Sequence, residues 1–408
     1  MRARSDWLWS GRRLDRGGRL WIAGALVLLG AALCGARAWS QASLHAESPN
    51  AWSQGSRASA FVYVGNAGSQ DITVFALSAS GKLELLGTVP VPGPADSGSS
   101  LPLAVSADRR FLFAAQRNEP YSVTTFSIDQ STGRLTERET GPLPDDMVYL
   151  TVDGTGRYLL AASYFGNKVT VSPIDLEGTV GEESQVIETL PNAHAIIIDP
   201  SNRFVLHTSL GGDAVYQQRL DGTTGKLTPN DPAIITVKEG SGPRHITLAP
   251  DSRFAYLLCE LDGSVLVMPF DTAKGTLSAP TQVASALPRR FEGEPWAADI
   301  HLTPDGAYLY ASERRSSTIA GFRVNARNGM LTPLGSFETT RQPRAFAIDP
   351  SGRFLVSLGE LSGRARVHGI DPRNGRLRTL QDYEVGTKPD WVEIVQLRAS
   401  SSGERSRP

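Results

Sequence analysis

Apolar and polar residues alternate in short stretches along most of the chain, and no stretch shows the period of an amphipathic helix. Alternation of this kind, as at residues 168–171 and 264–267, is typical of β-strands with one buried face. The clearest unit joins residues 246–249 to residues 254–258 through a Pro-Asp-Ser-Arg turn. Proline, aspartate and serine all favour tight turns, so this unit predicts a β-hairpin.

The same hairpin recurs along the chain at intervals of 46 to 54 residues. An aromatic residue opens its second strand at six places, namely Phe111, Tyr158, Phe204, Phe254, Tyr308 and Phe354. A second turn follows later in each unit and carries a glycine, at Gly81, Gly133, Gly178, Gly225, Gly275, Gly329 and Gly375. We expect these glycines to adopt positive φ angles in hairpin turns. Units of about 46 residues with four short strands each indicate an all-β protein, a β-propeller.

The two turns do not recur equally often, and the difference predicts how the ring closes. Seven units carry the second turn, but only six carry the first. We therefore expect the strand at residues 61–64 to pair with one from the far end of the chain, at residues 391–395, because this pairing removes free sheet edges. The prediction is a single seven-bladed β-propeller over residues 60–398. It has four antiparallel strands per blade, and the N- and C-terminal strands share one blade. Residues 399–408 are expected to be a disordered tail.

The first 42 residues differ from the rest of the chain. Six arginines precede an apolar run at residues 20–36, and small residues at 36–38 and 40–42 offer cleavage sites. This pattern predicts a secretory signal peptide over residues 1–42, followed by a linker at residues 43–59. The apolar run is slightly long for a signal peptide and short for a membrane span. We therefore expect an exported protein, periplasmic or secreted, with an uncleaved N-terminal anchor in the inner membrane as the alternative.

Charge and cysteine content narrow the expected partners. The first 42 residues carry a net charge of +5, which leaves about −6 on the remainder of the chain. This acidic remainder argues against nucleic acid as a partner, and against membrane contact except through the N-terminal segment. Only Cys259 follows the leader, and the histidines are scattered. We therefore expect no disulfide framework, no metal site and no cofactor, and we expect a monomer.

In a propeller, two sets of loops share one face: those that lead into the inner strands, and those that connect the second strand of a blade to the third. Loops on a rigid scaffold are where function usually lies, and both sets are rich in polar and aromatic residues here. The first set contains His194, Arg244, His245, Trp296 and Arg344, and the second contains Asn118, Tyr164, Glu260 and Arg314 together with Asn66, Arg117, Asn167, Glu313 and Glu360. An antiparallel hairpin should bring Arg244, His245 and Glu260 to one rim. An ion pair between blades is the structural alternative for Arg244 and Glu260.

Other polar residues in the repeats are interpreted as structural. The arginine of the first turn recurs in five units and is therefore a repeat element: Arg110, Arg157, Arg203, Arg253 and Arg353. His301 lies within the pattern of an inner strand and is predicted to be a hydrogen-bonded core histidine. His207 and His368 are interpreted in the same way.

Three segments, residues 235–245, 296–306 and 342–353, resemble the seven-bladed β-propeller lactonase family. They contain the sequences Gly-Pro-Arg-His, Trp-Ala-Ala-Asp-Ile-His and Gln-Pro-Arg-Ala-Phe-Ala-Ile-Asp-Pro, and the resemblance extends over about residues 60–397. The family includes propeller-type 6-phosphogluconolactonases and the carboxy-muconate lactonizing enzyme. The resemblance implies catalysis by a histidine, two arginines and a glutamate, which fall on His194, Arg244, Arg314 and Glu260.

The resemblance also implies a metal-independent lactonase that hydrolyses a sugar-derived lactone such as 6-phosphogluconolactone, an anionic small molecule. Arg244 or Arg314 would stabilise the oxyanion, and Glu260 or His194 would act as the base. Arg344 and the remaining arginine would hold a phosphate or carboxylate group, because guanidinium binds such groups through paired hydrogen bonds. Further contacts to the substrate are expected from His245, Tyr164, Asn118 and Trp296.

Three alternatives remain open at this stage. One is an exported, non-catalytic propeller that binds a protein or a sugar at the mouth of the channel, because this scaffold commonly serves as a binding platform. The second is muconate-type lactonizing activity, a cycloisomerase reaction. The third, a calcium-dependent lactonase, is disfavoured because arginines occupy positions where oxygen ligands would be needed.

Overall fold

The computed structural model describes residues 58–94 and 99–397. The predicted signal peptide or anchor at residues 1–42, most of the linker at 43–59 and the tail at 399–408 lie outside the described residues. The described residues form strands and turns but no helix, as the alternating pattern predicted. Accordingly, no helix among them is long and apolar enough to cross a membrane.

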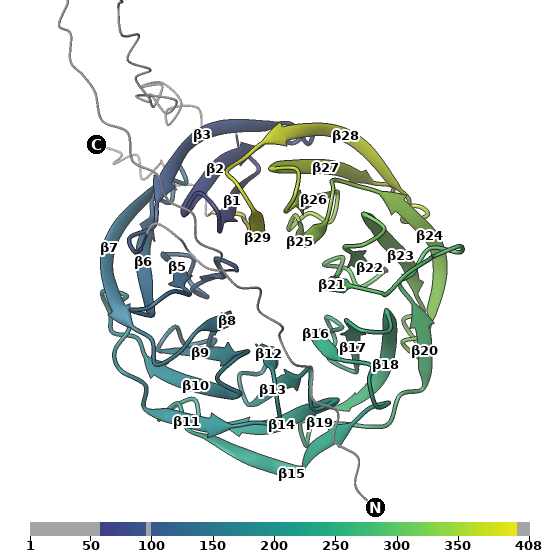
Figure 1. Ribbon diagram of the computed structural model, residues 1–408, viewed down its shortest axis with the longest axis horizontal. Coiled ribbons are helices and arrows are strands. Elements are labelled where there is room, and N and C mark those ends of the chain that lie inside the picture. The colour runs from purple at the N-terminus through teal and green to yellow at the C-terminus, as the bar shows by residue number, and fades with distance from the viewer. Residues whose placement is uncertain (1–57, 95–98, 398–408) are drawn as a thin grey trace, which may run out of the picture. The chain divides into compact units, whose positions relative to one another are not determined.

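Seven antiparallel sheets surround a central channel, which confirms the predicted seven-bladed propeller (Figure 1). Blade one contains β29 (Pro389–Val395), β1 (Ala60–Asn66), β2 (Asp71–Leu77) and β3 (Leu83–Pro90). Blade two contains β4 (Leu103–Val105), β5 (Phe111–Gln116), β6 (Ser122–Ile128) and β7 (Leu135–Pro142), and blade three contains β8 (Met147–Val152), β9 (Tyr158–Ser163), β10 (Lys168–Pro173) and β11 (Gln185–Glu188). Blade four contains β12 (Ala193–Ile198), β13 (Phe204–Ser209), β14 (Ala214–Leu220) and β15 (Leu227–Thr236).

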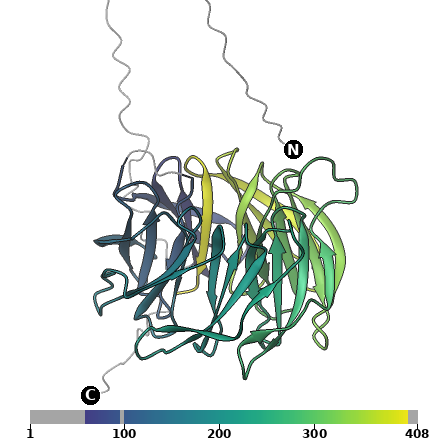
Figure 2. The same ribbon diagram turned by 60° about the horizontal axis from the view of Figure 1, so that its bottom comes forward.

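Blade five has an outer strand that is divided in two, so its sheet contains β16 (Pro243–Leu248), β17 (Phe254–Cys259), β18 (Ser264–Asp271), β19 (Thr276–Leu277) and β20 (Gln282–Ser285). Blade six contains β21 (Ala297–Leu302), β22 (Tyr308–Glu313), β23 (Thr318–Val324) and β24 (Leu331–Glu338). Blade seven contains β25 (Pro343–Ile348), β26 (Phe354–Gly359), β27 (Arg364–Ile370) and β28 (Leu377–Glu384). In Figure 2 the strands run from one face of the ring to the other, so each blade presents loops on both faces.

The ring closes as the unequal count of turns predicted. Strand β29 pairs with β1 in antiparallel register, with Phe61 opposite Val395 and Val64 opposite Val392 (Figure 1). The inner strand of blade one therefore comes from the C-terminal end of the chain, and its other three strands come from the N-terminal end. Seven clusters of buried apolar residues fill the spaces between neighbouring blades.

The glycine of each second turn is held under an aromatic ring of the preceding blade. All seven glycines have φ angles between 71° and 90°, as predicted. A Cβ atom built on Gly275 would lie 2.0 Å from the ring of Phe204, and one on Gly81 would lie 2.4 Å from the ring of Phe354. These turns therefore require glycine for both conformation and space. The contacts join each blade to the next, and the pair formed by Phe354 and Gly81 completes the circle.

The arginines of the first turn have the structural role that their repetition predicted. Arg203 donates from Nη2 to the carbonyl oxygen of Thr272 at 3.0 Å, in the next blade, and its guanidinium carbon lies 4.9 Å from the centre of the Phe204 ring. Arg253 makes the corresponding bond to the carbonyl oxygen of Ala326 at 2.6 Å. These arginines reinforce the contact between successive blades.

Two of the three histidines that were interpreted as core residues are buried in the sheets. His368 Nε2 lies 3.2 Å from Thr339 Oγ1, so this residue is a hydrogen-bonded core histidine as predicted. His207 is fully buried and stacks on Tyr216, with ring centres 4.5 Å apart, but neither of its nitrogens has a hydrogen-bond partner among the described residues. The predicted hydrogen bond was therefore wrong for His207.

Candidate active site

One face of the ring gathers the polar residues of blades four to seven. The backbone of Glu260, just after β17, is hydrogen-bonded to both neighbouring loops: its N–H donates to the Gly242 carbonyl at 2.7 Å, and its carbonyl accepts the N–H of Ala297 at 3.1 Å. The N–H of Arg314, just after β22, donates to the Trp296 carbonyl at 3.1 Å. The two sets of loops therefore meet at one rim of the channel. The hydrogen bonds between them hold the backbone of Glu260 and of Arg314 in place.

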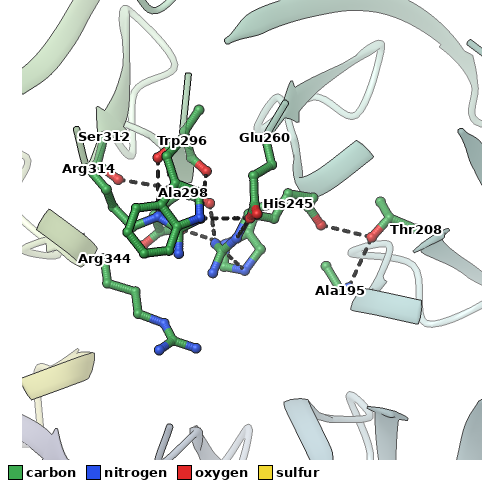
Figure 3. A network of polar contacts seen from close by, with 12 residues as sticks. Ala195, Thr208, His245, Glu260, Trp296, Ala298, Ser312, Arg314 and Arg344 are labelled. Atoms are coloured by element: carbon green, nitrogen blue, oxygen red, sulfur yellow. Dashed lines mark hydrogen bonds and ion pairs between the residues drawn. The ribbon is translucent and has the colours of Figure 1, made fainter. Parts of the chain in front are cut away.

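Glu260 lies between two arginines and contacts both through the same oxygen. Its Oε2 is 2.9 Å from Arg244 Nε and 2.7 Å from Arg314 Nη2 (Figure 3). Arg314 donates a hydrogen bond there, whereas the N–H of Arg244 Nε is not directed at the oxygen, so that contact is an ion pair alone. Arg244 and Glu260 both belong to blade five, and the pair with Arg314 joins blade five to blade six. The structural alternative for Arg244 and Glu260, an ion pair between blades, is wrong for that pair, which lies within blade five, and the pair between blades is the one that Glu260 forms with Arg314.

The guanidinium group of Arg244 is hydrogen-bonded to the described residues through Nη1 but not through Nη2. Its Nη1 donates to the carbonyl oxygen of Ala298 and to His245 Nε2, the latter at 3.1 Å. Its Nη2 makes no hydrogen bond to any described residue. The side chain is only 4% exposed. Burial lowers the pKa of Arg244, although the charge of Glu260 opposes the shift. The two N–H groups of Nη2 are therefore left for a ligand.

Arg314 is fixed in a similar way. It donates from Nε to the Trp296 carbonyl at 3.1 Å and from Nη2 to the Ala297 carbonyl at 3.2 Å, while Nη1 has no partner among the described residues. Its guanidinium lies over the Trp296 ring, 3.9 Å from the centre, which is a favourable cation–π distance. Burial, followed by the positive charge of Arg244, lowers the pKa of Arg314 to about 9.

Arg344 is the third arginine of the rim. Its Nη1 donates to the Ser99 carbonyl at 2.6 Å and to Glu360 Oε1 at 3.1 Å, and its other two nitrogens make no hydrogen bond to the described residues. After burial, the positive charge of Arg344 is among the causes that lower the pKa of both Arg244 and Arg314. Three arginines thus present unused donors toward one region, an arrangement suited to an anion.

His194 is a further buried residue of the rim. It belongs to β12 and is 7% exposed, and its ring centre lies 5.2 Å from that of His245 and 5.9 Å from that of Tyr164. Its Nδ1 is buried without a hydrogen-bond partner. Burial, followed by the charge of Arg244, lowers the pKa of His194 well below its usual value. The imidazole is therefore neutral at pH 7.

A cavity of about 220 Å³ occupies the channel beside this rim. Its wall includes His194, Arg244, His245 and Arg344 from the predicted set. It also includes polar and aromatic residues that the sequence analysis did not select: Tyr149, Asp299, Asp390, Trp391 and Glu393. These residues lie inside inner strands rather than in loops. The available signal was a polar residue at alternate positions of an inner strand, because alternate side chains of such a strand face the channel.

The prediction that His301 is a core residue was wrong. It lines the same cavity, and its side chain retains 42% of its exposed surface. Its Nε2 lies 3.1 Å from Asp299 Oδ2, so the predicted hydrogen bond is present. Burial lowers the pKa of His301, but the charge of Asp299 outweighs this effect, and the pKa is raised.

Two carboxyl groups of β29 titrate near neutrality. Burial raises the pKa of Asp390 to about 7, although Arg344 opposes the shift. Burial likewise raises the pKa of Glu393 to about 7, although Trp391 donates a hydrogen bond to its Oε1 at 3.0 Å. Asp390 accepts the N–H of Leu101 at 3.2 Å. Part of the cavity wall therefore changes its charge close to pH 7.

The remaining predicted site residues are distributed unevenly. Trp296 packs against Arg314, and Tyr164 lies beside His194. Asn118 neither lines the cavity nor bonds to this cluster, so the structure does not place it with the others. Four other loop residues bond mainly to their own surroundings: Asn66 to Asp71 and Thr73, Arg117 to Asp146, Asn167 to Asn192, and Glu313 to Ser316 and the N–H of Trp296. No group of three or more histidine, cysteine, aspartate and glutamate residues in the described part of the chain could hold a metal ion.

Comparisons with known proteins agree with this architecture. A family model described as "Lactonase, 7-bladed beta-propeller" matches residues 94–394. A 6-phosphogluconolactonase of Pectobacterium carotovorum is 40% identical over 336 residues, which cover 82% of this chain and 98% of that protein. A 6-phosphogluconolactonase of Serratia proteamaculans is 39% identical over 334 residues, which cover 82% of this chain and 98% of that protein.

A solved structure shares the fold over nearly its full length. The periplasmic gluconolactonase of Pseudomonas aeruginosa superimposes with a TM-score of 0.75 at 28% sequence identity. The alignment covers 83% of this chain and 99% of that protein. The shared region corresponds to the ring of blades that carries the rim cluster.

Proposed function

The chain belongs to the seven-bladed β-propeller lactonase family, and we propose that it is a lactonase that hydrolyses a sugar-derived lactone, with 6-phosphogluconolactone as the first candidate substrate. Curated relatives of about 40% identity are 6-phosphogluconolactonases, and they are covered almost completely by the alignment. The observation that carries the proposal is that Arg244 and Arg314 share one carboxylate oxygen of Glu260 at the channel rim and that, together with Arg344, they keep side-chain nitrogens that bond to no described residue.

Attack of water on the lactone carbonyl places negative charge on the carbonyl oxygen. Arg244 Nη2 is suited to stabilise this oxyanion, because it belongs to a largely buried side chain, is fixed by the contacts of Nη1 and bonds to no described residue. A preorganised donor in a site with little water stabilises the transition state more than a flexible donor in solution does. The reaction we propose needs no metal ion, because guanidinium groups supply the positive charge.

Glu260 is assigned as the base. Its Oε2 holds the two arginines, and its Oε1 has no partner among the described residues and can take the proton of the attacking water. His194 is less suited to this role, because accepting a proton would place a further positive charge in a buried position beside Arg244, and both burial and that charge lower its pKa. With an unpartnered Nδ1 next to the cavity, His194 is instead suited to hydrogen-bond the substrate or the departing hydroxyl.

Arg344 is assigned to the anionic group of the substrate. It is less buried than Arg244, with 17% of its side chain exposed, and two of its nitrogens are free of bonds to the described residues. Guanidinium binds phosphate through paired hydrogen bonds. Arg344→Ala should therefore raise KM for the phosphorylated lactone much more than for the unphosphorylated one.

The deciding experiment compares the rates of hydrolysis of 6-phosphogluconolactone and gluconolactone by the purified protein, after subtraction of spontaneous hydrolysis. Turnover of either lactone supports the proposal, and a preference for the phosphorylated one supports the assignment of Arg344. A protein that hydrolyses neither lactone, nor any other in a panel, would favour the non-catalytic binding propeller.

The location of the protein is part of the proposal. The arginine-rich leader followed by an apolar run favours export, and the Pseudomonas aeruginosa relative is a periplasmic protein. We expect a mature chain that begins near Trp39 or Ser43. N-terminal sequencing of the protein from its native host tests this expectation, and an intact Met1 in the soluble cytoplasmic fraction would contradict it.

A further inference from the structure

A line of hydrogen-bonded side chains runs from the rim into the channel. Arg244 Nη1 is 3.1 Å from His245 Nε2, and His245 Nδ1 is 2.8 Å from Asp299 Oδ1. Asp299 Oδ2 is in turn 3.1 Å from His301 Nε2. The line connects blade five to blade six, and its first member is the arginine assigned to the oxyanion.

The charges at the two ends determine how the hydrogens are placed along this line. Burial by itself raises the pKa of Asp299, but His301 and the hydrogen bond from His245 outweigh it, and the pKa is well below its usual value. Asp299 is therefore a carboxylate and can only accept, so His245 Nδ1 carries a hydrogen. Arginine can only donate, so His245 Nε2 must be unprotonated. One neutral tautomer of His245 satisfies both neighbours.

Protonation of His245 would break this arrangement, and the surroundings oppose it. Burial, followed by the charge of Arg244, lowers the pKa of His245 to about 4. The imidazole is therefore neutral throughout the range in which most enzymes operate. Its ring lies against Tyr149, with centres 5.3 Å apart, and against His194, so the ring plane is also confined.

Asp299 is itself firmly positioned. It is 5% exposed, and its two oxygens also accept the backbone N–H of Ile300 at 2.9 Å and of Phe346 at 3.0 Å. Phe346 belongs to β25, so the carboxylate is anchored to blade seven as well as to blades five and six. Four hydrogen bonds thus hold one buried carboxylate. Because one of them comes from His245 Nδ1, the fixed carboxylate also restricts the orientation of the His245 ring.

We propose that Asp299 and His245 are positioning residues for the reaction: Asp299 selects the tautomer of His245, and the lone pair of His245 Nε2 orients the guanidinium of Arg244. With Nη1 held by His245 and by the Ala298 carbonyl, Nη2 is the donor left for the lactone oxygen. The proposal rests on the proposed function only in that last step. The orientation of Arg244 itself is a property of the protein without substrate.

The first test separates the two bonds of His245 by substitution. Glutamine places an amide oxygen close to the position of Nε2, so His245→Gln keeps an acceptor for Arg244. Asparagine places its amide close to Nδ1, so His245→Asn keeps the donor to Asp299 but loses the acceptor. We expect His245→Asn to lower kcat by about 10–100-fold, the range found for residues that orient a functional group. His245→Gln should retain clearly more of the parental kcat than His245→Asn does.

The opposite order, or equal losses in the two variants, would overturn the proposal, because a purely structural role depends on volume and not on which nitrogen is replaced. Asp299→Asn should lower kcat by a similar factor with a smaller effect on KM. Asp382→Asn is the matched control, because Asp382 pairs with Arg366 outside the cavity. A thermal midpoint that falls for Asp299→Asn while kcat is retained would assign Asp299 to structure alone.

The second test needs no substrate. In protein labelled with ¹⁵N-histidine, the nitrogen shifts of His245, assigned by their loss in His245→Gln, should indicate the neutral tautomer with hydrogen on Nδ1 from pH 5 to pH 8. The Nε2-protonated tautomer, or an imidazolium, would overturn the relay even if the protein is an active lactonase. Conversely, the expected tautomer in a protein that hydrolyses no lactone would overturn the proposed function and leave the positioning of Arg244 intact.

Discussion

The arginines of this propeller occupy two contrasting environments. Arg253, in a first turn, is about half exposed, and it bonds to Asp251 and to a carbonyl of the next blade. Arg244 and Arg314, at the rim, are each 4% exposed and share one carboxylate oxygen of Glu260. The first kind recurs at the same place in five repeats. Among the described residues, two buried arginines share one carboxylate oxygen only at the rim of blades five and six, whereas the buried Arg117 pairs with Asp146 alone.

The comparison separates arginines that stabilise the fold from arginines that form the candidate site. The turn arginines add a contact that every blade can use, and their cost is small because water still solvates them. Two buried guanidinium groups around one partly buried carboxylate cost more, because removing charges from water costs several kcal/mol per ion. A propeller can close without that arrangement, as blades one to three show. We therefore interpret the exception to the repeat as functional.

Glu260→Gln tests the rim most severely. It removes the one carboxylate among the described residues that pairs with both Arg244 and Arg314, and it removes the assigned base. We expect kcat to fall roughly 10²–10⁴-fold, the contribution of a general base. Stability should fall as well, by about 3–5 kcal/mol, because two buried cations lose their counter-charge. Glu384→Gln, which alters an exposed pair with Arg364, is the control and should change neither quantity appreciably.

Arg244→Ala tests the oxyanion assignment. Loss of one preorganised donor should lower kcat by about 10²–10³-fold. KM should change much less, because the donor acts mainly in the transition state. Steady-state kinetics on the lactone that the parent hydrolyses provide the measurement. A variant with the parental kcat would show that Arg244, like the arginines of the first turns, has no catalytic role.

The architecture followed from the sequence because the residues that define it repeat. Phe204 and Gly275 have counterparts in every blade, so their spacing predicted both the strands and the number of blades. The loop positions of Arg244 and Glu260 also followed, since a hairpin brings its outer ends together. The hydrogen-bond partner of His245 in the neighbouring blade did not follow. It depends on how adjacent blades are rotated against each other, which places Asp299 of β21 beside His245 of β16.

Which side chains of the inner strands face the channel could not be predicted from the sequence either. Whether an alternate residue faces the channel or the space between two sheets depends on the register of the strand. His301 was assigned to the core for this reason, and Asp390 and Glu393 were not selected. Asp390 lies in the part of β29 that precedes the predicted strand at residues 391–395. Carboxylates within the stretch of an inner strand were the feature of the sequence that indicated such residues.

Gly275→Ala tests the repeated contact between blades. The new Cβ would meet the Phe204 ring at 2.0 Å, and φ is +73°, which disfavours any residue other than glycine. We expect a loss of about 2–4 kcal/mol, the sum of a conformational and an overpacking effect. Gly156→Ala is the matched control, because its φ of +72° is the same but nothing lies within 4 Å of the new atom. Denaturant unfolding of the two variants should differ by more than about 1 kcal/mol. Equal losses would show that the aromatic contact contributes nothing.

Asp390→Asn tests whether the pKa of the Asp390 carboxyl group in the channel wall is raised. The pKa of Asp390 is raised from its usual value to about 7, so the folded protein holds the proton more tightly than the unfolded chain does. The parent must therefore lose stability as pH rises from about 4 to about 7. Asparagine cannot ionise and is spared this loss, while its amide oxygen can still accept the N–H of Leu101.

The stability difference between Asp390→Asn and the parent should accordingly be near zero at pH 4 and should favour the variant above pH 7. Its size should be about 1–4 kcal/mol, because each unit of pKa shift corresponds to about 1.4 kcal/mol. Thermal or denaturant unfolding at pH 5 and pH 8 measures it. A difference that is the same at both pH values would contradict the raised pKa.

Arg253→Ala completes the comparison with the smallest expected effect. The side chain is 52% exposed, its ion pair with Asp251 is solvated, and its guanidinium carbon lies 5.6 Å from the centre of the Phe254 ring. Exposed pairs contribute at most about 1 kcal/mol, so the variant should unfold at nearly the parental denaturant concentration. Lactone turnover should be unchanged, because the first turns lie at the other end of the strands from the rim. The same substitution at Arg244 removes an equally charged side chain, so the two variants differ only in place. If Arg253→Ala also lowered kcat tenfold or more, catalysis would depend on the rigidity of the whole ring, and repetition would no longer separate the residues of the fold from those of the site.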